Sequence, residues 1–169
     1  MTHKLIRYIL LFFVCILLQV LIFNRIALFN IAFPVVFIYF IIRLPIDLKL
    51  SYTFTLAFLL GIIVDIFSDT PGVNALACTL IAAIRTPIFY AYMAKDDNTV
   101  RMTPGISTMG IIDYSKYLLT FVVIYCVLAF TIEYFSFADV KGIVIMSSAS
   151  AALTFVLLLA TDSLIPVKS

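Results

Sequence analysis

The chain has 169 residues, of which 64% are hydrophobic and 12% are charged, and its formal net charge is +2. An ordinary soluble domain carries about 25% charged residues, which is roughly twice the fraction found here. The mean hydropathy of the chain is +1.21. The composition excludes a soluble globular protein and predicts an integral membrane protein. We expect a single domain over residues 1–169, because no polar stretch is long enough to build a second core.

Six apolar runs are candidates for transmembrane helices, because a helix needs about 20 apolar residues to cross a bilayer core. They cover about residues 5–23, 28–44, 51–68, 73–93, 112–134 and 141–161. The first run ends in Phe23-Asn24-Arg25, without the small residues that a signal peptidase requires, so we expect it to be retained as a helix. The prediction is an all-α integral membrane bundle with six transmembrane helices.

The second run is the weakest, because it contains Asn30 and Pro34 and its uninterrupted apolar part is short. The positive charges favour keeping it. With six spans and a cytoplasmic N-terminus, nine basic residues lie in the cytoplasm: Lys4, Arg7, Arg43, Lys49, Arg85, Lys95, Arg101, Lys116 and Lys168. Only Arg25 and Lys141 lie outside. Without this span only three would be cytoplasmic, against the positive-inside rule, so both termini are expected in the cytoplasm.

The stretch from Gly61 to Ala75 interrupts the apolar sequence with polar residues. A carboxylate at the centre of a membrane helix costs about 2.5–3.5 kcal/mol on insertion scales. The expected topology places Asp65 one helical turn, or about 6 Å, below an outer turn, where this cost is smaller. Three interpretations of Asp65 remain open: a polar anchor of the helical hairpin, a contact for a partner's helix, and an ion or proton site.

The outer turn itself consists of Asp69, Thr70, Pro71 and Gly72, and Asn74 follows it. Asp before Thr-Pro-Gly is ordinary turn chemistry. Asp65 is one candidate to cap the helix that begins near residue 73, and Asp69 and Thr70 are others, with Pro71 near the first turn of that helix.

Arg85 is a second charge inside an apolar run. It lies about 20 Å from the outer turn along a straight helix, which is too far for an ion pair with Asp65. It is expected in the cytoplasmic third of the membrane. There it either extends its charged end to the interface or pairs with Asp162, Asp113 or Asp47.

The last apolar run contains the small residues Ser147-Ser148-Ala149-Ser150-Ala151-Ala152. Ser147 with Ala151, and Ser148 with Ala152, are small residues four positions apart, a spacing that lets helix backbones approach closely. Such pairs indicate either packing inside the bundle or a docking face for another protein's helix.

The residues needed for enzymatic chemistry are missing from the sequence. Cys15, Cys78 and Cys126 lie within apolar runs and are interpreted as core residues, and the only histidine is His3. No nucleophile–base arrangement, phosphate-binding loop, metal-ligand spacing or nucleic-acid-binding patch occurs. We therefore expect no enzymatic activity, no cofactor, no metal and no nucleic-acid partner.

The block Gly61-x-x-x-Asp65 followed by Pro71-Gly72-x-Asn74-Ala75, with Asn30 and Pro34 upstream, resembles the rod shape-determining protein MreD family of bacteria. The family often has a residue between the proline and the glycine, whereas here they are adjacent. The resemblance implies a multi-pass scaffold of the bacterial inner membrane that binds the bitopic protein MreC. It also implies wall synthases and MreB as further partners in cell elongation.

The MreD family is also similar in fold to the substrate-binding subunits of energy-coupling-factor vitamin transporters, which supplies the main alternative function. Those subunits use small residues on the first helix to dock their transport partner, and residues 9–23 here have no such face. A vitamin pocket also needs several convergent polar groups, which are few. An ion-coupled carrier would need charges near the midplane. We expect a scaffold whose basic loop, with Lys95, Arg101 and Lys116, lies against anionic lipid.

Overall fold

The computed structural model describes residues 2–23, 33–93, 102–133 and 140–164. Several residues used in the sequence analysis lie outside this part of the chain: Arg25, Asn30, Lys95, Arg101 and Lys168. Within the described residues the secondary structure is helical, without strands. The prediction of an all-α membrane protein is therefore confirmed at this level.

The described residues contain seven helices: α1 (Thr2–Leu21), α2 (Ile38–Ile42), α3 (Leu50–Ser68), α4 (Val73–Tyr92), α6 (Ile106–Met109), α7 (Ile111–Glu133) and α8 (Val140–Leu164). Four of them, α3, α4, α7 and α8, are long and apolar enough to cross a membrane. The apolar helical stretch within α1, Ile6–Leu21, is shorter. The chain is thus a multi-pass candidate with four clear spanning helices in its described part.

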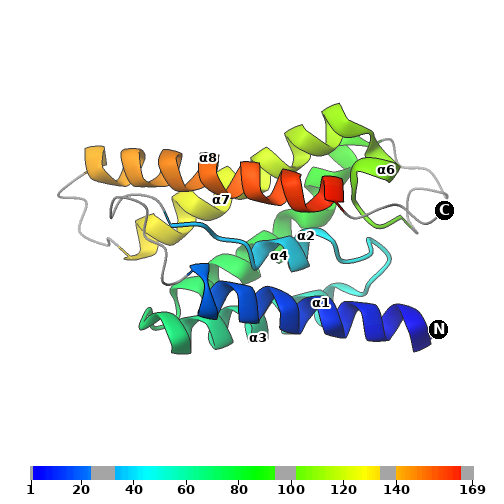
Figure 1. Ribbon diagram of the computed structural model, residues 1–169, viewed down its shortest axis with the longest axis horizontal. Helices are drawn as coiled ribbons and strands as arrows, with labels where there is room; N and C mark the ends of the chain where they lie inside the picture. The colour runs from blue at the N-terminus through cyan, green and yellow to red at the C-terminus, as the bar shows by residue number, and fades with distance from the viewer. Residues whose placement is uncertain (1, 24–32, 94–101, 134–139, 165–169) are drawn as a thin grey trace.

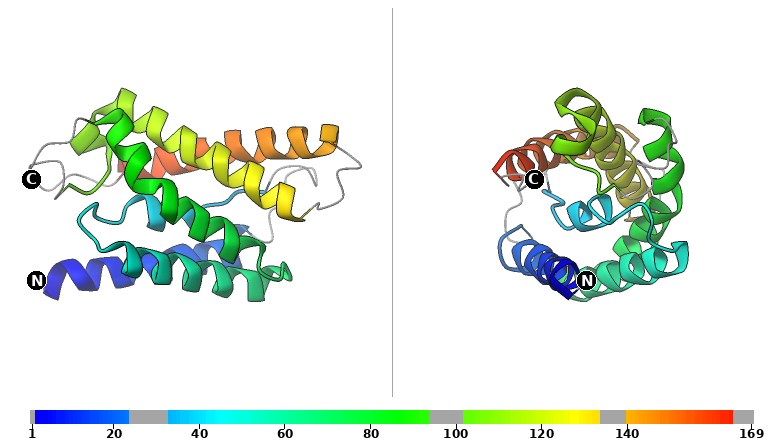
Figure 2. Two further views of the ribbon diagram at one scale, coloured as in Figure 1. Left: turned by 180° about the vertical axis from the view of Figure 1, so that it is seen from behind. Right: turned by 90° about the vertical axis from the view of Figure 1, so that its right-hand side faces the viewer.

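The long helices form an incomplete ring around a short buried helix. The main contacts run from α1 to α3, from α3 to α4, from α4 to α7 and from α7 to α8. Seen from one end, α1 and α8 lie at the two open ends of this ring and α2 lies inside it (Figure 2, right). The five residues of α2 are at most 4% exposed, so α2 forms the centre of the apolar core.

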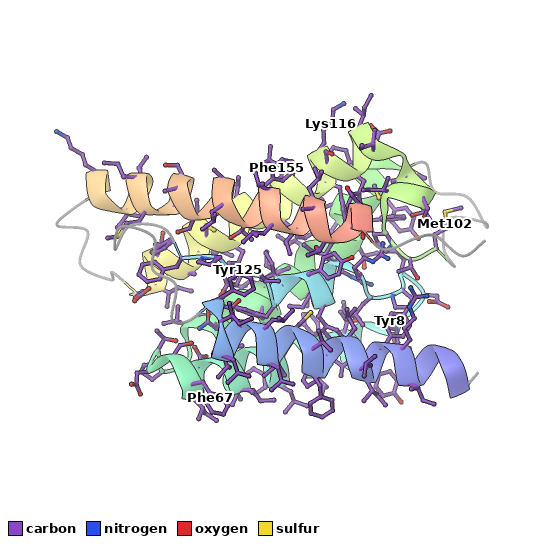
Figure 3. The ribbon with its side chains drawn as sticks, in the orientation of Figure 1. Tyr8, Phe67, Met102, Lys116, Tyr125 and Phe155 are labelled. Carbon is purple, nitrogen blue, oxygen red and sulfur yellow. The ribbon has the colours of Figure 1, made fainter. Side chains whose placement is uncertain are left out.

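The two ends of the bundle differ in charge. The first residues of α1 and the last residues of α8 lie at one end, here called the termini end, and the α3–α4 connection lies at the opposite, turn end (Figure 1). Arg7 lies near the start of α1, Lys49 directly precedes α3, and Arg43 pairs with Asp162 near the end of α8. Lys116, near the start of α7, also lies toward the termini end (Figure 3). Lys141 lies at the start of α8, which is at the turn end.

The expectation of a helix over residues 28–44 is wrong for the described part of that run. Residues 33–36 form no helix, and α2 has only five residues. Pro34 has no backbone N–H and disfavours helical conformation in the residue before it, so it interrupts a helix that would run through residues 28–44. The described part of this run is instead a non-helical segment, residues 33–36, followed by one short helix.

A non-helical backbone can lie in an apolar interior only if its polar groups find partners. Gln19 of α1 supplies two of them. Its side-chain nitrogen donates to the carbonyl of Pro34 at 3.0 Å, and its side-chain oxygen accepts from the backbone N–H of Val36 at 2.9 Å. The amide of Gln19 therefore bonds to the backbone as a neighbouring strand would.

Helix α8 supplies the other partners of the non-helical segment. The N–H of Phe33 donates to Ser150 Oγ at 2.9 Å, and the N–H of Val35 donates to Thr154 Oγ1 at 3.0 Å. Ser150 and Thr154 are one helical turn apart and both are fully buried. The non-helical segment thus connects α1 and α8, the two helices at the open ends of the ring.

Candidate functional site: the anchored hairpin at the turn end

Asp65, near the end of α3, holds the start of α4 through its carboxylate. Its Oδ1 accepts hydrogen bonds from the Thr70 hydroxyl, the Asn74 backbone N–H and the Asn74 side-chain amide, each at 2.9 Å. Its Oδ2 accepts from the backbone N–H of Ala75 at 2.9 Å. The side chain therefore satisfies two of the N–H groups that every helix leaves unpaired in its first turn.

The chain reverses between α3 and α4 through two residues in the left-handed region. Asp69 ends α3 with φ 54°, and its N–H donates to the carbonyl of Asp65. Gly72 precedes α4 with φ 84° and provides no side-chain cap. Asp69 and Thr70, two of the residues considered as caps, accept no backbone N–H from the first turn of α4 in the described structure. The capping role belongs to Asp65.

The hairpin is also joined to α7 by a side-chain network. The Tyr125 hydroxyl donates to Asn74 Oδ1, and the Asn74 amide donates to Thr70 Oγ1 at 3.0 Å. Tyr125 is 1% exposed, and its ring packs edge-on against Phe37 with the centroids 5.6 Å apart. Tyr125 lies near the middle of the bundle, between the upper and lower helices (Figure 3). The network links the turn to α7 and to the residue preceding α2.

Gly61 is required where α3 and α4 pass each other. A Cβ atom at this position would lie 2.4 Å from the Cα of Ala75 and 2.6 Å from the carbonyl oxygen of Asn74. Both are backbone atoms, so no side-chain rotation relieves the overlap. The close approach brings Asp65, one helical turn later, within reach of the α4 N–H groups.

These contacts favour the anchoring interpretation of Asp65. The residue is 7% exposed and four donors point their hydrogens at its carboxylate. A hydrogen bond to a charged group contributes about 1.5–3 kcal/mol, so these bonds offset the cost of burying the charge. A bound cation would have to displace donors that already surround the oxygens, which disfavours an ion site.

A cavity of about 290 Å³ lies beside this hairpin at the turn end. Its walls come from α1, the non-helical segment, the end of α3 and α7, and they include Phe23, Phe33, Phe67 and Phe130. Asp69 and Glu133 provide carboxylates to the lining, and Asn74 and Tyr125 form part of it. The lining mixes aromatic and polar side chains. Among the polar ones, Thr70, Asn74 and Tyr125 already hold hydrogen bonds within the hairpin network.

Arg85 makes neither of the two contacts expected from the sequence. It is 1% exposed, so its charged end does not reach the interface, and it forms no ion pair among the described residues. Its Nη1 donates to the carbonyls of Leu44 at 2.6 Å and Ile41 at 3.3 Å, and its Nη2 donates to that of Pro45 at 2.7 Å. The guanidinium thus satisfies the carbonyls at the end of α2, where the helix dipole favours a cation.

Two of the three carboxylates considered as partners of Arg85 are paired elsewhere: Asp113 lies 3.9 Å from Lys116, and Asp162 is held by Arg43. Asp162 of α8 pairs with Arg43 at 3.1 Å and accepts a hydrogen bond from the Tyr39 hydroxyl at 2.6 Å. Its other oxygen accepts the N–H of Ile106, the first residue of α6, at 3.1 Å. This cluster fastens α2, α6 and α8 together at the termini end. The expected topology places both Arg43 and Arg85 toward the cytoplasmic side. Charge counting therefore does not tell which of them pairs with Asp162.

The small residues of α8 divide between two faces. Ser147 and Ala151 are both 6% exposed and face the bundle, whereas Ser148 and Ala152 are exposed on the outer face. The Ser148 hydroxyl is bonded within its own helix, to the carbonyl of Ile145. One small-residue pair therefore packs inside the protein, and the other is available to a neighbouring helix.

The apolar helices and buried polar anchors together define the class of this molecule, a helical multi-pass membrane protein. No group of three or more His, Cys, Asp or Glu that could hold a metal ion occurs within the described ranges. No family model, curated protein or solved structure matches the chain.

Proposed function

We propose that this chain is a non-enzymatic scaffold of the MreD type in the bacterial inner membrane, where it binds an MreC-like bitopic protein and helps to couple MreB filaments to peptidoglycan synthesis. The observation that carries the proposal is the hairpin around Asp65. Four of the residues that resemble the MreD family, Gly61, Asp65, Asn74 and Ala75, contact each other there. A fixed outer turn is suited to being recognised by a partner.

The proposal includes six membrane crossings in a bundle similar to the substrate-binding subunits of energy-coupling-factor transporters. The 20 residues of α1 correspond to about 30 Å of helix, which is enough for one crossing. For the second crossing, a non-helical chain advances up to about 3.3 Å per residue, so residues 33–44 cover more depth than a helix of that length. The start of α1 and the end of α8 lie at the same end of the bundle, which agrees with an even number of crossings (Figure 1).

The partner's transmembrane helix has a suitable surface on the outer face of α8. Ser148 and Ala152 are exposed there, flanked by Val144 and Val156, which are 60% and 64% exposed. Small residues allow a second helix to approach closely, and the flanking valines add apolar contact area. In this arrangement the outer turn, with Asp69, is free to contact the extracytoplasmic part of the partner.

Co-purification tests the scaffold proposal directly. The full chain, co-expressed with the MreC-like protein of the same organism and extracted in mild detergent, is expected to elute with it as one complex. A chain carrying Ser148→Leu and Ala152→Leu should retain its fold and lose most of the complex. Failure of the unaltered chain to co-purify with this partner would contradict the proposal.

A second candidate function rests on the cavity of about 290 Å³ at the turn end. Ligand pockets are typically about 300–1,000 Å³, so this cavity is at the small end of that range. A substrate-binding subunit of a vitamin transporter would bind a vitamin-sized molecule there. Tight binding of such a ligand by the purified chain, measured by calorimetry, together with no binding of the MreC-like protein, would favour this alternative.

A further inference from the structure

A second cavity, of about 510 Å³, lies at the termini end between α1, α2 and the residues before and within α6. Its polar wall consists of Arg7, Tyr8, Arg43, Thr103, Ser107 and Thr108. The Tyr8 hydroxyl is 3.1 Å from Thr103 Oγ1, which joins α1 to the segment before α6. Tyr8 and Met102 both lie toward this end of the molecule (Figure 3). The wall thus brings two guanidinium groups and several hydroxyls to one space.

Arg43 is fixed at the wall of this cavity by two contacts. Its Nη1 bonds to Asp162 and to the carbonyl of Pro104, 2.9 Å away, and the side chain is 18% exposed. Among the described residues no hydrogen bond is made by its Nη2 or Nε. Arg7 is exposed, so its full charge remains available. With one carboxylate against two guanidinium groups, the polar wall carries a net positive charge.

The other wall of the cavity is apolar and runs along α1. Leu10 and Val14 line it, and they are 63% and 41% exposed. They lie about 5 Å and 10 Å from Arg7 along the helix, in the direction of the membrane interior. A cationic, hydroxyl-rich wall near the membrane surface therefore continues into an apolar wall that points into the bilayer.

We propose that this cavity binds the headgroup of an anionic phospholipid, with the phosphate against Arg7 and Arg43 and an acyl chain along Leu10 and Val14. Arg binds phosphate oxygens through paired N–H donors, and basic pockets between transmembrane helices are suited to lipid headgroups. The apolar wall distinguishes a lipid from a soluble phosphate compound, which would gain nothing from it. The proposal is independent of the scaffold function.

Native mass spectrometry of the full chain, released from detergent with a defined lipid, tests this site. The unaltered chain is expected to retain one phosphatidylglycerol molecule in preference to phosphatidylcholine. Arg7→Gln should lower the retained fraction of phosphatidylglycerol about fivefold, the loss expected for one basic residue near a membrane surface. Lys49→Gln is the matched control, because Lys49 is a similarly exposed cation directly before α3, outside the cavity.

A second variant separates the cavity from its charge. Ser107 is exposed in the cavity wall, so Ser107→Trp fills space there without changing the charge, and it should reduce lipid retention while thermal stability is kept. Equal effects of Arg7→Gln and Lys49→Gln, or equal retention of phosphatidylcholine, would overturn the proposal. Displacement of the lipid by millimolar inorganic phosphate would assign the site to a soluble phosphate and would also overturn it.

Discussion

The carboxylate of Asp65 in α3 lies 2.9 Å from the backbone nitrogen of Ala75 in α4, across a turn that contains two left-handed residues. The same carboxylate also accepts a hydrogen bond from the backbone N–H of the preceding residue, Asn74. A side chain from one membrane helix thus caps the next one. The charge is useful because a carboxylate offers acceptors only, and all four neighbouring groups are donors.

Asp65→Asn should destabilise the protein by about 2–3 kcal/mol, because the new amide nitrogen cannot accept the hydrogen bonds now made to one carboxylate oxygen. Thermal unfolding in detergent, followed by circular dichroism, measures the change. Asp69→Asn is the control, since Asp69 is exposed with φ 54° and asparagine tolerates that conformation well. An unchanged midpoint for Asp65→Asn would show that the negative charge is not needed.

Gly61→Ala should lower stability by about 1–3 kcal/mol, because the added methyl group meets the α4 backbone and forces the two helices apart. The measurement is again the unfolding midpoint in detergent. Leu59→Ala, on the same helix at a residue 46% exposed to the surroundings, is expected to have little effect. If both variants unfold at the same temperature, the close approach of α3 and α4 is not important.

Arg85→Gln should destabilise the protein by about 3 kcal/mol or more, because it leaves the carbonyls at the end of α2 without a charged donor in a buried site. Arg85→Lys keeps the charge and should recover part of this loss, although lysine cannot bridge the carbonyls as the planar guanidinium does. The yield of monodisperse protein and its unfolding midpoint distinguish the two. Equal loss in both variants would assign the effect to shape rather than charge.

Thr154→Val should cost about 0.5–2 kcal/mol, since it removes the acceptor for the Val35 N–H while nearly conserving side-chain volume. Ser150→Ala should have a similar effect through Phe33. Ser148→Ala is expected to be neutral, because the Ser148 hydroxyl is on the exposed face of the same helix and bonds only within α8. Hydrogen exchange of residues 33–36 provides a local readout, and it should increase only in the first two variants.

Replacing Ser148 and Ala152 by leucine should reduce co-purification of the MreC-like partner at least about tenfold, because bulky residues prevent the close helix approach that small residues permit. Thr55→Leu is the matched control. Thr55 is likewise exposed on a membrane helix, with its hydroxyl bonded to the carbonyl of Ser51 in the same helix. Equal complex yields from both chains would place the partner on a different face.

Hydropathy and turn chemistry anticipated much of the architecture. The apolar runs at 51–68 and 73–93 lie on α3 and α4, and the polar turn lies between them. The partners of Asp65 could be anticipated in kind, because Asn74 and Ala75 follow it by only nine and ten residues across a predicted turn. Contacts between residues that are close in the sequence can thus be recognised from the residues around them.

The remaining features depend on contacts that no local pattern reveals. Pro34 signals the break in the helix, but the acceptors of the Phe33 and Val35 N–H groups, Ser150 and Thr154, come more than 115 residues later. Asp162 lies 123 residues from Tyr39, and hydropathy could not decide between Arg43 and Arg85 as its partner. The ligands of Arg85 are backbone carbonyls, which every residue has, so composition could not identify them.

The dependence of residues 33–36 on α8 has a consequence for biogenesis. The segment emerges from the ribosome early, whereas Ser150 and Thr154 emerge near the end of synthesis. Until then the N–H groups of Phe33 and Val35 lack their final acceptors, and unsatisfied backbone groups are costly in lipid. The hydrogen bonding of residues 33–36 is therefore complete only once the last helix has been made. A nascent chain truncated before α8 would present an incomplete segment, which membrane quality-control proteases could recognise.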